Sequence, residues 1–296
     1  MRIVSPYPPG GVTDTIGRAL AQKLTETWGV QVIVDNRLGA NGTMGATFVA
    51  KSPADGHTIL VIPAGYAPNP LLYSKLPCDQ ARDLMPVSHL ASGPLVRDGH
   101  APGANREGHP VVHRAGQGQA WSHQLRRARH RRAAAPERRV VQPHGGGEDD
   151  AHTLIPYKEP ATAIIDLMAG KIQANFINIL QSLPLVKAGK LRGLGVTSPQ
   201  RSPIAPDLPA IAEAGLPGFD MTNWYGMLVP TGTLRDRVNK LQREVNRILN
   251  LPELKERLAN DGMTVVASTH EQFSTFLAKE TDKFAKVIRA AGIKPQ

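Results

Sequence analysis

The chain has 296 residues, of which 41% are hydrophobic, and a formal net charge of +10. This length predicts about two domains with sizeable apolar cores, and no run reaches the roughly 20 apolar residues that would span a bilayer. The single cysteine, Cys78, excludes an internal disulfide and a multi-cysteine metal site.

The first predicted elements are a short apolar strand over residues 3–4 and a proline-glycine loop that follows it. Pro8 and Pro9 lack the amide hydrogens that a strand ladder needs, so the strand ends there. Gly10 and Gly11 adopt positive φ at low cost and turn the chain sharply. We therefore expect backbone amides of this loop to point outward.

An amphipathic helix is predicted to follow, with Thr13 or Asp14 as its N-cap. The free amides and the dipole of such a helix end favour a carboxylate or a phosphate. The alternative interpretation is a plain connector between a strand and a helix. The inward stripe of the predicted helix consists of Ile16, Ala19, Leu20 and Leu24.

A second strand is predicted over residues 31–34, followed by Gly39, Gly42 and Gly45 and a helix through residues 48–49. The spacing G-x-x-G-x-x-G differs from the dinucleotide fingerprint. It favours tight turning and close helix packing over a nucleotide site.

A third strand over residues 58–62 ends in a loop that contains Gly65, and Asn69 is predicted to cap a helix with Pro70 in its first turn. In open parallel sheets, ligands bind beyond the carboxyl ends of the strands. The loops around Gly10 and Gly65 are therefore expected to converge on one site.

The composition changes abruptly between residues 97 and 151. This stretch holds ten Arg and no Lys, six of the ten His, and six acidic residues, so it carries +4 of the net charge. Its basic run lacks the interleaved aromatic residues that stack on nucleic-acid bases, so we expect no nucleic-acid partner. A disordered linker is a second interpretation.

A third interpretation is that residues 97–153 are translated out of frame. If each original codon is the last two bases of one codon and the first base of the next, residues 116–125 are compatible with Ala-Lys-Ala-Lys-Pro-Gly-His-Thr-Asn-Tyr. That string is typical of a helix end, a turn and a strand. We expect a frame disruption over this segment.

The C-terminal part is the most regular. Thr233 and Asp236 resemble a capping box, Pro252 opens the next helix, Gly262 lies just past that helix, and a short strand follows over residues 265–266. Two apolar stripes at helical spacing are predicted to face the core. They are Leu234, Val238, Leu241, Val245 and Ile248, and then Phe273, Phe276, Leu277, Phe284, Val287 and Ile288.

Short strands alternating with helices predict a largely parallel α/β architecture. Many short motifs, in order along nearly the whole chain, resemble the substrate-binding proteins of tripartite tricarboxylate transporters, the Bug-type receptors. They include Tyr7-Pro8-Pro9-Gly10-Gly11 with Asp14, Asn36-Arg37, Asp55-Gly56, Asn69-Pro70 with Tyr73, Ile155-Pro156-Tyr157-Lys158, Ala188-Gly189-Lys190-Leu191-Arg192, Val196-Thr197-Ser198, Glu213-Ala214-Gly215-Leu216-Pro217-Gly218 and Trp224-Tyr225-Gly226.

The resemblance implies a two-domain α/β clamshell of the periplasmic binding-protein type (type II-like). Domain one would comprise residues 1–96 and 223–296, and domain two residues 97–222, with domain two disrupted by the out-of-frame segment over residues 97–153. The implied function is an extracytoplasmic solute-binding receptor that captures a small carboxylate and delivers it to permease subunits in the membrane. The ligand-binding residues carried onto this chain are Tyr7, Gly10, Gly11, Thr13, Asp14 and Gly65.

In this role Asp14 would orient a water or an amide, because two like charges in a cleft repel each other. The resemblance also implies a periplasmic monomer with no cofactor and no metal. Because the printed chain lacks an export signal, we expect a truncated or mis-started reading of a secreted protein. Ile177 stands where the family usually has Asp, which weakens a polar contact there.

Two other functions stay open. A solute sensor that presents a bound carboxylate to a signalling partner would use the same fold. An α/β enzyme acting on a small acid would need catalytic motifs, and the chain has no G-x-S-x-G, H-E-x-x-H or Walker sequence. His109 and His113 have the spacing of metal ligands, but Pro110 between them opposes a shared helix face.

Overall fold

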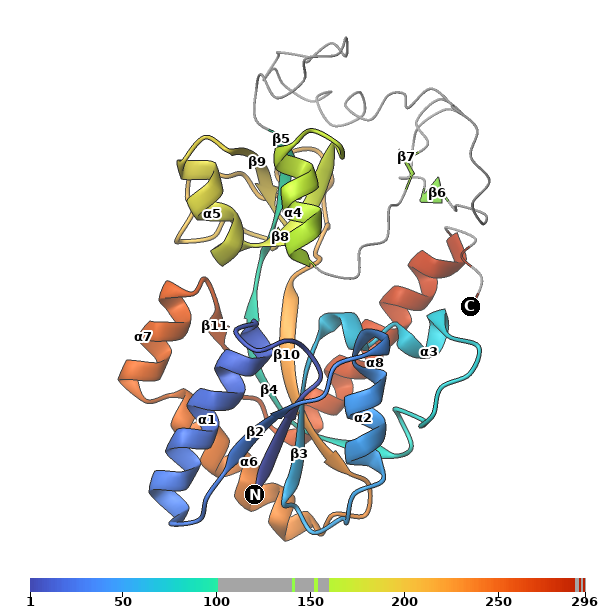
Figure 1. Ribbon diagram of the computed structural model, residues 1–296, viewed down its shortest axis with the longest axis vertical. Helices are drawn as coiled ribbons and strands as arrows, with labels where there is room; N and C mark the ends of the chain where they lie inside the picture. Colours follow the sequence, from blue (N-terminus) through green and yellow to red (C-terminus); the bar gives the residue numbers. More distant parts are fainter. Residues whose placement is uncertain (101–139, 142–151, 154–159, 291–292, 294, 296) are drawn as a thin grey trace. The chain divides into compact units, whose positions relative to one another are not determined.

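The computed structural model describes residues 1–100, 140–141, 152–153, 160–290, 293 and 295. These residues form two compact units, which Figure 1 shows as ribbons. Unit 1 consists of Met1–Ser92 and Asn223–Gln296, and unit 2 consists of Gly93–Thr222. No helix of the described residues is long and apolar enough to cross a membrane.

Unit 1 is built on a six-stranded sheet in the order β11-β4-β10-β3-β1-β2. β1 is parallel to both β2 and β3, whereas β10 is antiparallel to β3 and β11 is antiparallel to β4. The prediction of a largely parallel sheet therefore holds for one half of this sheet only. The strands are β1 (Arg2–Ser5), β2 (Ile33–Asn36), β3 (Thr58–Pro63), β4 (Leu84–Gly93), β10 (Asn223–Pro230) and β11 (Thr264–Val265).

Helices cover both faces of this sheet (Figure 1). Alternate strand residues point to opposite faces, so Ile3 packs with α1, α6 and α7, whereas Val4 packs with α2 and α8. The helices are α1 (Val12–Trp28), α2 (Thr43–Ala50), α3 (Asn69–Leu72), α6 (Arg235–Leu249), α7 (Pro252–Asn260) and α8 (His270–Ala290), with 3-10 turns η1 (Ala40–Gly42) and η2 (Ala64–Tyr66).

The sheet face that carries Val4 holds an aromatic cluster. Trp224 and Phe273 are fully buried with ring centroids 5.9 Å apart, and the half-buried Phe276 and the buried His89 complete the cluster. The indole nitrogen of Trp224 donates a hydrogen bond to Glu280 at 3.0 Å. A Cβ at Gly226 would lie 2.0 Å from the Phe273 ring, so only glycine fits at this point of β10.

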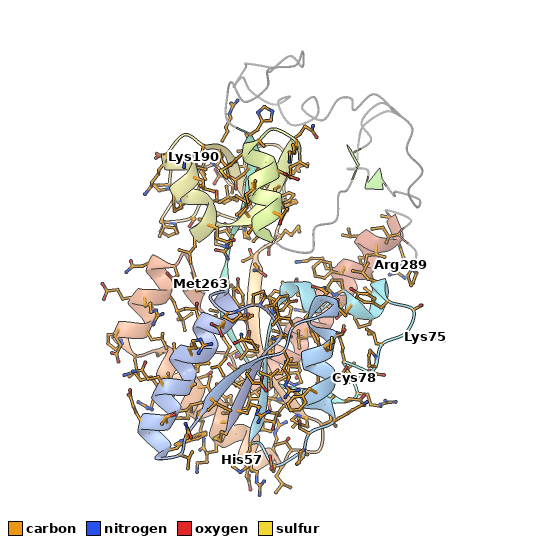
Figure 2. All side chains as sticks on the ribbon, in the orientation of Figure 1. His57, Lys75, Cys78, Lys190, Met263 and Arg289 are labelled. Atoms are coloured by element: carbon orange, nitrogen blue, oxygen red, sulfur yellow. The ribbon has the colours of Figure 1, made fainter. Side chains whose placement is uncertain are left out.

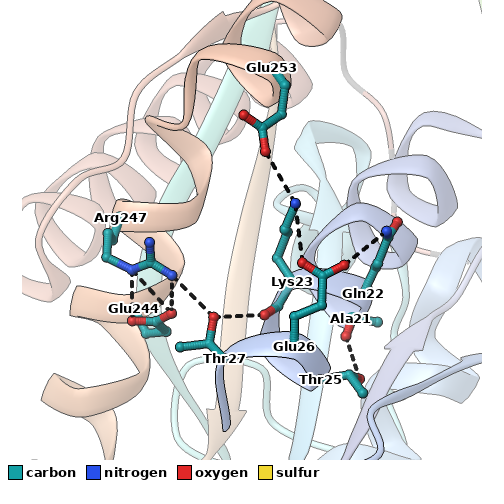
Figure 3. Close-up of polar contacts among 9 residues, drawn as sticks. All are labelled: Ala21, Gln22, Lys23, Thr25, Glu26, Thr27, Glu244, Arg247 and Glu253. Carbon is teal, nitrogen blue, oxygen red and sulfur yellow. Dashed lines mark hydrogen bonds and ion pairs between the residues drawn. The ribbon is translucent and has the colours of Figure 1, made fainter. Parts of the chain in front are cut away.

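On the sheet face that carries Ile3, polar contacts join α1 to α6 and α7 (Figure 3). Lys23 forms ion pairs with Glu26 at 3.2 Å and with Glu253 of α7 at 3.1 Å. Arg247 of α6 donates to the hydroxyl of Thr27 at 3.1 Å. These side chains are largely exposed, so the pairs orient the helices more than they stabilise the fold.

All three predicted helix caps are wrong. α1 begins after Gly11, α3 begins after Pro68 so that Asn69 is its first helical residue, and α6 begins after Leu234. None of the three residues before these helices makes a side-chain capping bond. The hydroxyl of Thr233 instead donates to the carbonyl of Pro230 at 2.7 Å, and Leu234 is 62% exposed because it precedes the helix. The other predicted stripe residues of α6 are buried.

Unit 2 has a three-stranded sheet in the order β8-β5-β9, and both of its strand pairs are antiparallel, unlike the parallel arrangement predicted. Val96, Ile179 and Val196 form the centre of one of its two small apolar clusters. Its elements are β5 (Leu95–His100), β8 (Ala174–Asn178), β9 (Leu191–Val196), α4 (Pro160–Met168) and α5 (Ile179–Lys187), and β6 (Val140–Val141) pairs with β7 (His152–Thr153).

Candidate functional site

The candidate site is the edge of unit 1 at which the three parallel strands end. Ser5 of β1 lies opposite Asn36 of β2, and β3 ends at Pro63 on the same edge. The segments that follow these strands, including the first turn of α1 and η2, hold all six predicted ligand residues. They are Tyr7, Gly10, Gly11, Thr13, Asp14 and Gly65.

The first loop turns sharply into α1. Gly10 has φ +80°, as the sequence predicts, whereas Gly11 has φ −72° and does not need the freedom expected of it. The Gly11 amide donates to the carbonyl of Pro8 at 3.2 Å. Gly11 is the N-cap of α1 and has no side chain to bond the amides of the first turn. Because the first amides of a helix have no intrahelical acceptor, this helix end presents N–H donors and the positive end of its dipole.

The buried side chain of Asp14 stabilises the conformation of this loop through hydrogen bonds. Its side chain is nearly fully buried, and one carboxylate oxygen accepts from the Gly10 amide at 2.9 Å and from Arg18 at 2.8 Å. The other oxygen accepts from the Asn36 amide at 2.9 Å. Burial opposes the charged form, but the hydrogen bonds from Arg18, Gly10 and Asn36 outweigh it and lower the pKa of Asp14.

The bonds of Asp14 correct one expectation and explain another. The Gly10 amide points at Asp14 and is not offered to a ligand. Arg18 balances the charge of Asp14, so the buried carboxylate leaves little net repulsion for an approaching anion. The buried hydroxyl of Thr13 accepts from Ser5 at 3.1 Å, which ties the start of α1 to the end of β1.

Asn41 links the loops that follow all three strands, and it was missed by sequence reasoning. It has φ +49°, and its amide nitrogen donates to the Gly65 carbonyl at 2.9 Å and to the Asn69 side chain at 2.8 Å. The hydroxyl of Tyr7 donates to the Asn41 side-chain oxygen at 3.2 Å. The signal was the dipeptide formed with Gly42, because Asn tolerates positive φ better than most residues.

Tyr7 stays a neutral donor at this edge, because burial and the nearby Tyr73 raise the pKa of its hydroxyl. Gly45 lets α2 approach the first loop, since a Cβ there would lie 2.8 Å from Pro6. This confirms the close packing predicted from the three glycines. The site thus combines the first-turn amides of α1 with one hydroxyl that the amide side chains hold in place, and the helix amides are suited to hydrogen-bond a small anion.

Within the described residues, no cluster of three or more His, Cys, Asp or Glu has the geometry to hold a metal ion. His109 and His113 lie outside the residues that the structure describes. Asp14, the one carboxylate of the site, is engaged by three donors and is not placed to act as a general base.

Comparison with known proteins agrees with this geometry. The sequence model of the tripartite tricarboxylate transporter family receptor matches residues 16–102 and 146–293. A UPF0065 protein from the tcbD-tcbE intergenic region of Pseudomonas sp. (strain P51) is 34% identical over 96% of this chain and 84% of its own length. Protein BugT of Bordetella pertussis is 31% identical over 99% of this chain and 90% of its own.

Two solved structures have the same fold over nearly their whole length. R. palustris Rpa4515 with adipate has a TM-score of 0.80 at 28% identity and covers 100% of this chain and 98% of its own. MatC from Rhodopseudomonas palustris with bound malate has a TM-score of 0.74 at 25% identity. The match covers 97% of this chain and 98% of the MatC chain. The chain therefore belongs to the tripartite tricarboxylate transporter receptor family, whose members are solute-binding proteins and not enzymes.

Proposed function

We propose that this protein is a periplasmic receptor that binds a small carboxylate and delivers it to the permease of a tripartite transporter. The observation that carries the proposal is the cluster of strand-end loops in unit 1, where the first turn of α1 presents backbone donors beside a neutralised Asp14 and beside the Tyr7 hydroxyl, which donates to Asn41 at 3.2 Å. Dicarboxylates are the first ligands to test, because the structural neighbours named above hold adipate and malate.

The six residues have different parts in this proposal. Gly11 exposes the first-turn amides, and the Tyr7 hydroxyl would exchange its bond to Asn41 for one to a carboxylate oxygen. Gly10, Thr13 and Asp14 hold the loop in shape, and Gly65 positions Asn41. Unit 2 would supply the second half of the grip, and one copy of the chain would carry the whole site.

We further propose that residues 97–153 are out of frame in this chain, which would remove part of that second half. Most of this segment lies outside the described residues. Two observations support the proposal. The family match omits residues 103–145, which fall inside the segment, and Asp98 at its start is fully buried in β5.

Asp98 lies on the same face of β5 as Val96, which belongs to an apolar cluster of unit 2. Ser182 donates to one carboxylate oxygen at 2.8 Å, but the other has no hydrogen-bond partner among the described residues. Burial raises the pKa of Asp98 to about 7. In the restored frame, the last two bases of the Asp98 codon and the first base of the Gly99 codon together encode Met or Thr. Either of these side chains fits a buried strand better than Asp does.

Calorimetric titration with malate and adipate tests the receptor function. It should be run on the printed chain and on a second chain in which codons 97–153 are read in the restored frame. We expect the restored chain to bind at least one dicarboxylate with no turnover, and the printed chain to bind it more weakly. Tyr7→Phe should weaken binding by about threefold to tenfold, the loss of one hydrogen bond.

The matched control is Ser52→Ala, which removes a hydroxyl that donates to the Phe48 carbonyl at 2.8 Å beyond the C-terminal end of α2. Equal effects of the two substitutions would contradict the assignment of Tyr7. Release of a product from either acid, or no binding of any di- or tricarboxylate to the restored chain, would contradict the receptor function. The nucleotide sequence of codons 90–155 tests the frame by itself.

A further inference from the structure

Asn36, the last residue of β2, makes three side-chain hydrogen bonds at the strand-end edge of unit 1. Its amide nitrogen donates to the Tyr7 carbonyl at 3.1 Å and to one Asp14 oxygen at 2.9 Å. Its side-chain oxygen accepts from the guanidinium of Arg18 at 3.3 Å. Asn36 therefore joins the end of β2 to the first loop and to α1, although it is not among the six predicted ligand residues.

The chemistry of these three partners requires an amide at position 36. A carbonyl and a carboxylate only accept hydrogen bonds, whereas a guanidinium only donates them. An amide side chain supplies two N–H donors and an acceptor, which is the set that the partners need. Aspartate at this position would turn the donors into acceptors, and alanine would supply neither. Both N–H groups of Asn36 are engaged, so it has none to offer a ligand.

The backbone brings Asn36 to the same edge as the first turn of α1. Figure 2 labels His57 at the start of the parallel strands, where the Arg2 amide donates to the His57 carbonyl at 2.8 Å. Asn36 lies at the opposite end of these strands, where it faces Ser5 in the ladder. The Ser5 hydroxyl donates to Thr13 at 3.1 Å. The ends of β1 and β2 thus hold the start of α1 through two separate attachments.

The first-turn amides lie between the two groups that Asn36 binds. The Tyr7 carbonyl precedes these amides and the Asp14 side chain follows them, so Asn36 holds both ends of residues 7–14. The Asp14 side chain is 3% exposed, and its oxygen that faces Asn36 has no second donor among the described residues. Without Asn36 this buried oxygen would lack a partner, which is costly for a carboxylate. The loop would then have to move to bring the oxygen to water or to a new donor.

We propose that Asn36 is a positioning residue of the ligand site. By fixing the Tyr7 carbonyl and the Asp14 carboxylate, it holds the first-turn amides of α1 in the orientation that binds a carboxylate. This role rests on the receptor function proposed above, and Asn36 performs it without touching the ligand.

The first test compares Asn36→Ala with Asn246→Ala in an amide NMR titration of the full chain with malate. Asn246 is a matched control, because its amide nitrogen also donates two hydrogen bonds, to the carbonyls of Ala267 and Ser268, and its oxygen also accepts one, from Ser88. Both substitutions should lower the melting temperature. Only Asn36→Ala should raise the dissociation constant of malate, by about threefold to tenfold.

Asn36→Asp should give a pH dependence that Asn36→Ala lacks. The new carboxylate faces the Asp14 carboxylate, with Arg18 as the positive charge beside it, while Asp35 and Arg37 of the same strand region pair with each other at 2.8 Å. Two adjacent carboxylates raise the pKa of one of them, and the protonated form regains an O–H donor. The dissociation constant of malate, divided by that of the parent at the same pH, should therefore fall between about pH 8 and about pH 5. The same ratio for Asn36→Ala should stay constant.

Three results would overturn the role of Asn36 and leave the receptor function in place. They are equal dissociation constants for Asn36→Ala and the parent, an equal rise in Asn246→Ala, and a ratio for Asn36→Asp that does not change with pH. If the parent binds neither malate nor any other dicarboxylate, the receptor function fails, and the role of Asn36 fails with it.

Discussion

Replacing Asp14 with Asn should destabilise unit 1 and remove part of its pH dependence. The substitution keeps the size of the side chain but removes its charge and turns one acceptor into a donor. The amide of Gly10 and the guanidinium of Arg18 both donate to the same Asp14 oxygen. In the variant the amide keeps only one oxygen, so either these two donors or the side-chain amide of Asn36 would face another N–H group.

The loss of unfolding free energy in Asp14→Asn follows from these contacts. Arg18 is largely exposed and regains water, so its loss contributes little. The Gly10 amide loses a charge-assisted bond and the α1 dipole loses a buried anion. Together these effects predict a loss of about 1–3 kcal/mol of unfolding free energy at neutral pH.

The pH dependence has a definite sign. The pKa of Asp14 is lowered in the folded chain from its ordinary value of 3.8, so its stabilisation is complete above that value and is lost as the pH falls through the folded pKa. The difference between the parent and Asp14→Asn should therefore be constant from neutral pH down to about 5 and shrink below about 4.

Urea unfolding followed by tryptophan fluorescence measures this difference. Trp28 and Trp224 both lie in unit 1, and a Trp121→Phe background removes the third tryptophan of the chain. Asp236→Asn is the matched control, because Asp236 also lies in the first turn of a helix but is exposed. We expect that control to lose less than about 1 kcal/mol. Equal losses in the two variants, or a difference that persists unchanged at pH 3, would refute the role assigned to Asp14.

Two further predictions concern the core of unit 1. Gly226→Ala should cost about 1–3 kcal/mol by overpacking against Phe273, whereas Gly17→Ala meets its nearest atom at 3.5 Å and should be tolerated; equal melting temperatures in calorimetry would contradict this. Burial lowers the pKa of His89 from 6.5 to about 4, so unfolding free energy should fall as the pH drops from about 6.5 to 4. His89→Phe should flatten that part of the profile, and an unchanged slope would show that another group causes it.

The sequence predicts helices and strands well where the buried residues recur with the regular period of that element. Residues 16, 20 and 24 lie on the buried face of α1, and β3 lies within one residue of its predicted bounds. The predicted second strand is displaced by two residues. In α8 the stripe holds for Phe273 and Ile288, but Val287 is 53% exposed, because a 3.6-residue period places it at the edge of the buried face.

The direction of the strands and the partners of the polar side chains could not be predicted from the periodicity of buried residues. β10 runs antiparallel to β3 because the chain returns to unit 1 after 130 residues of unit 2, and local sequence does not encode that path. Asp14, Thr233 and Asp236 have the right chemistry for caps. Asp14 and Thr233 instead bond other groups, since partners such as Asn36 are distant in the sequence.

The most direct test of the central claim is a titration of the isotopically labelled full chain with malate or adipate, followed by amide NMR. The half-site in unit 1 predicts that the largest shifts fall on the amides of Gly11, Val12 and Thr13 and on the side-chain amide of Asn41. These shifts should saturate at ligand concentrations on the order of millimolar even if unit 2 contributes nothing to binding. Saturable shifts confined to other residues, or none at the start of α1, would contradict the account.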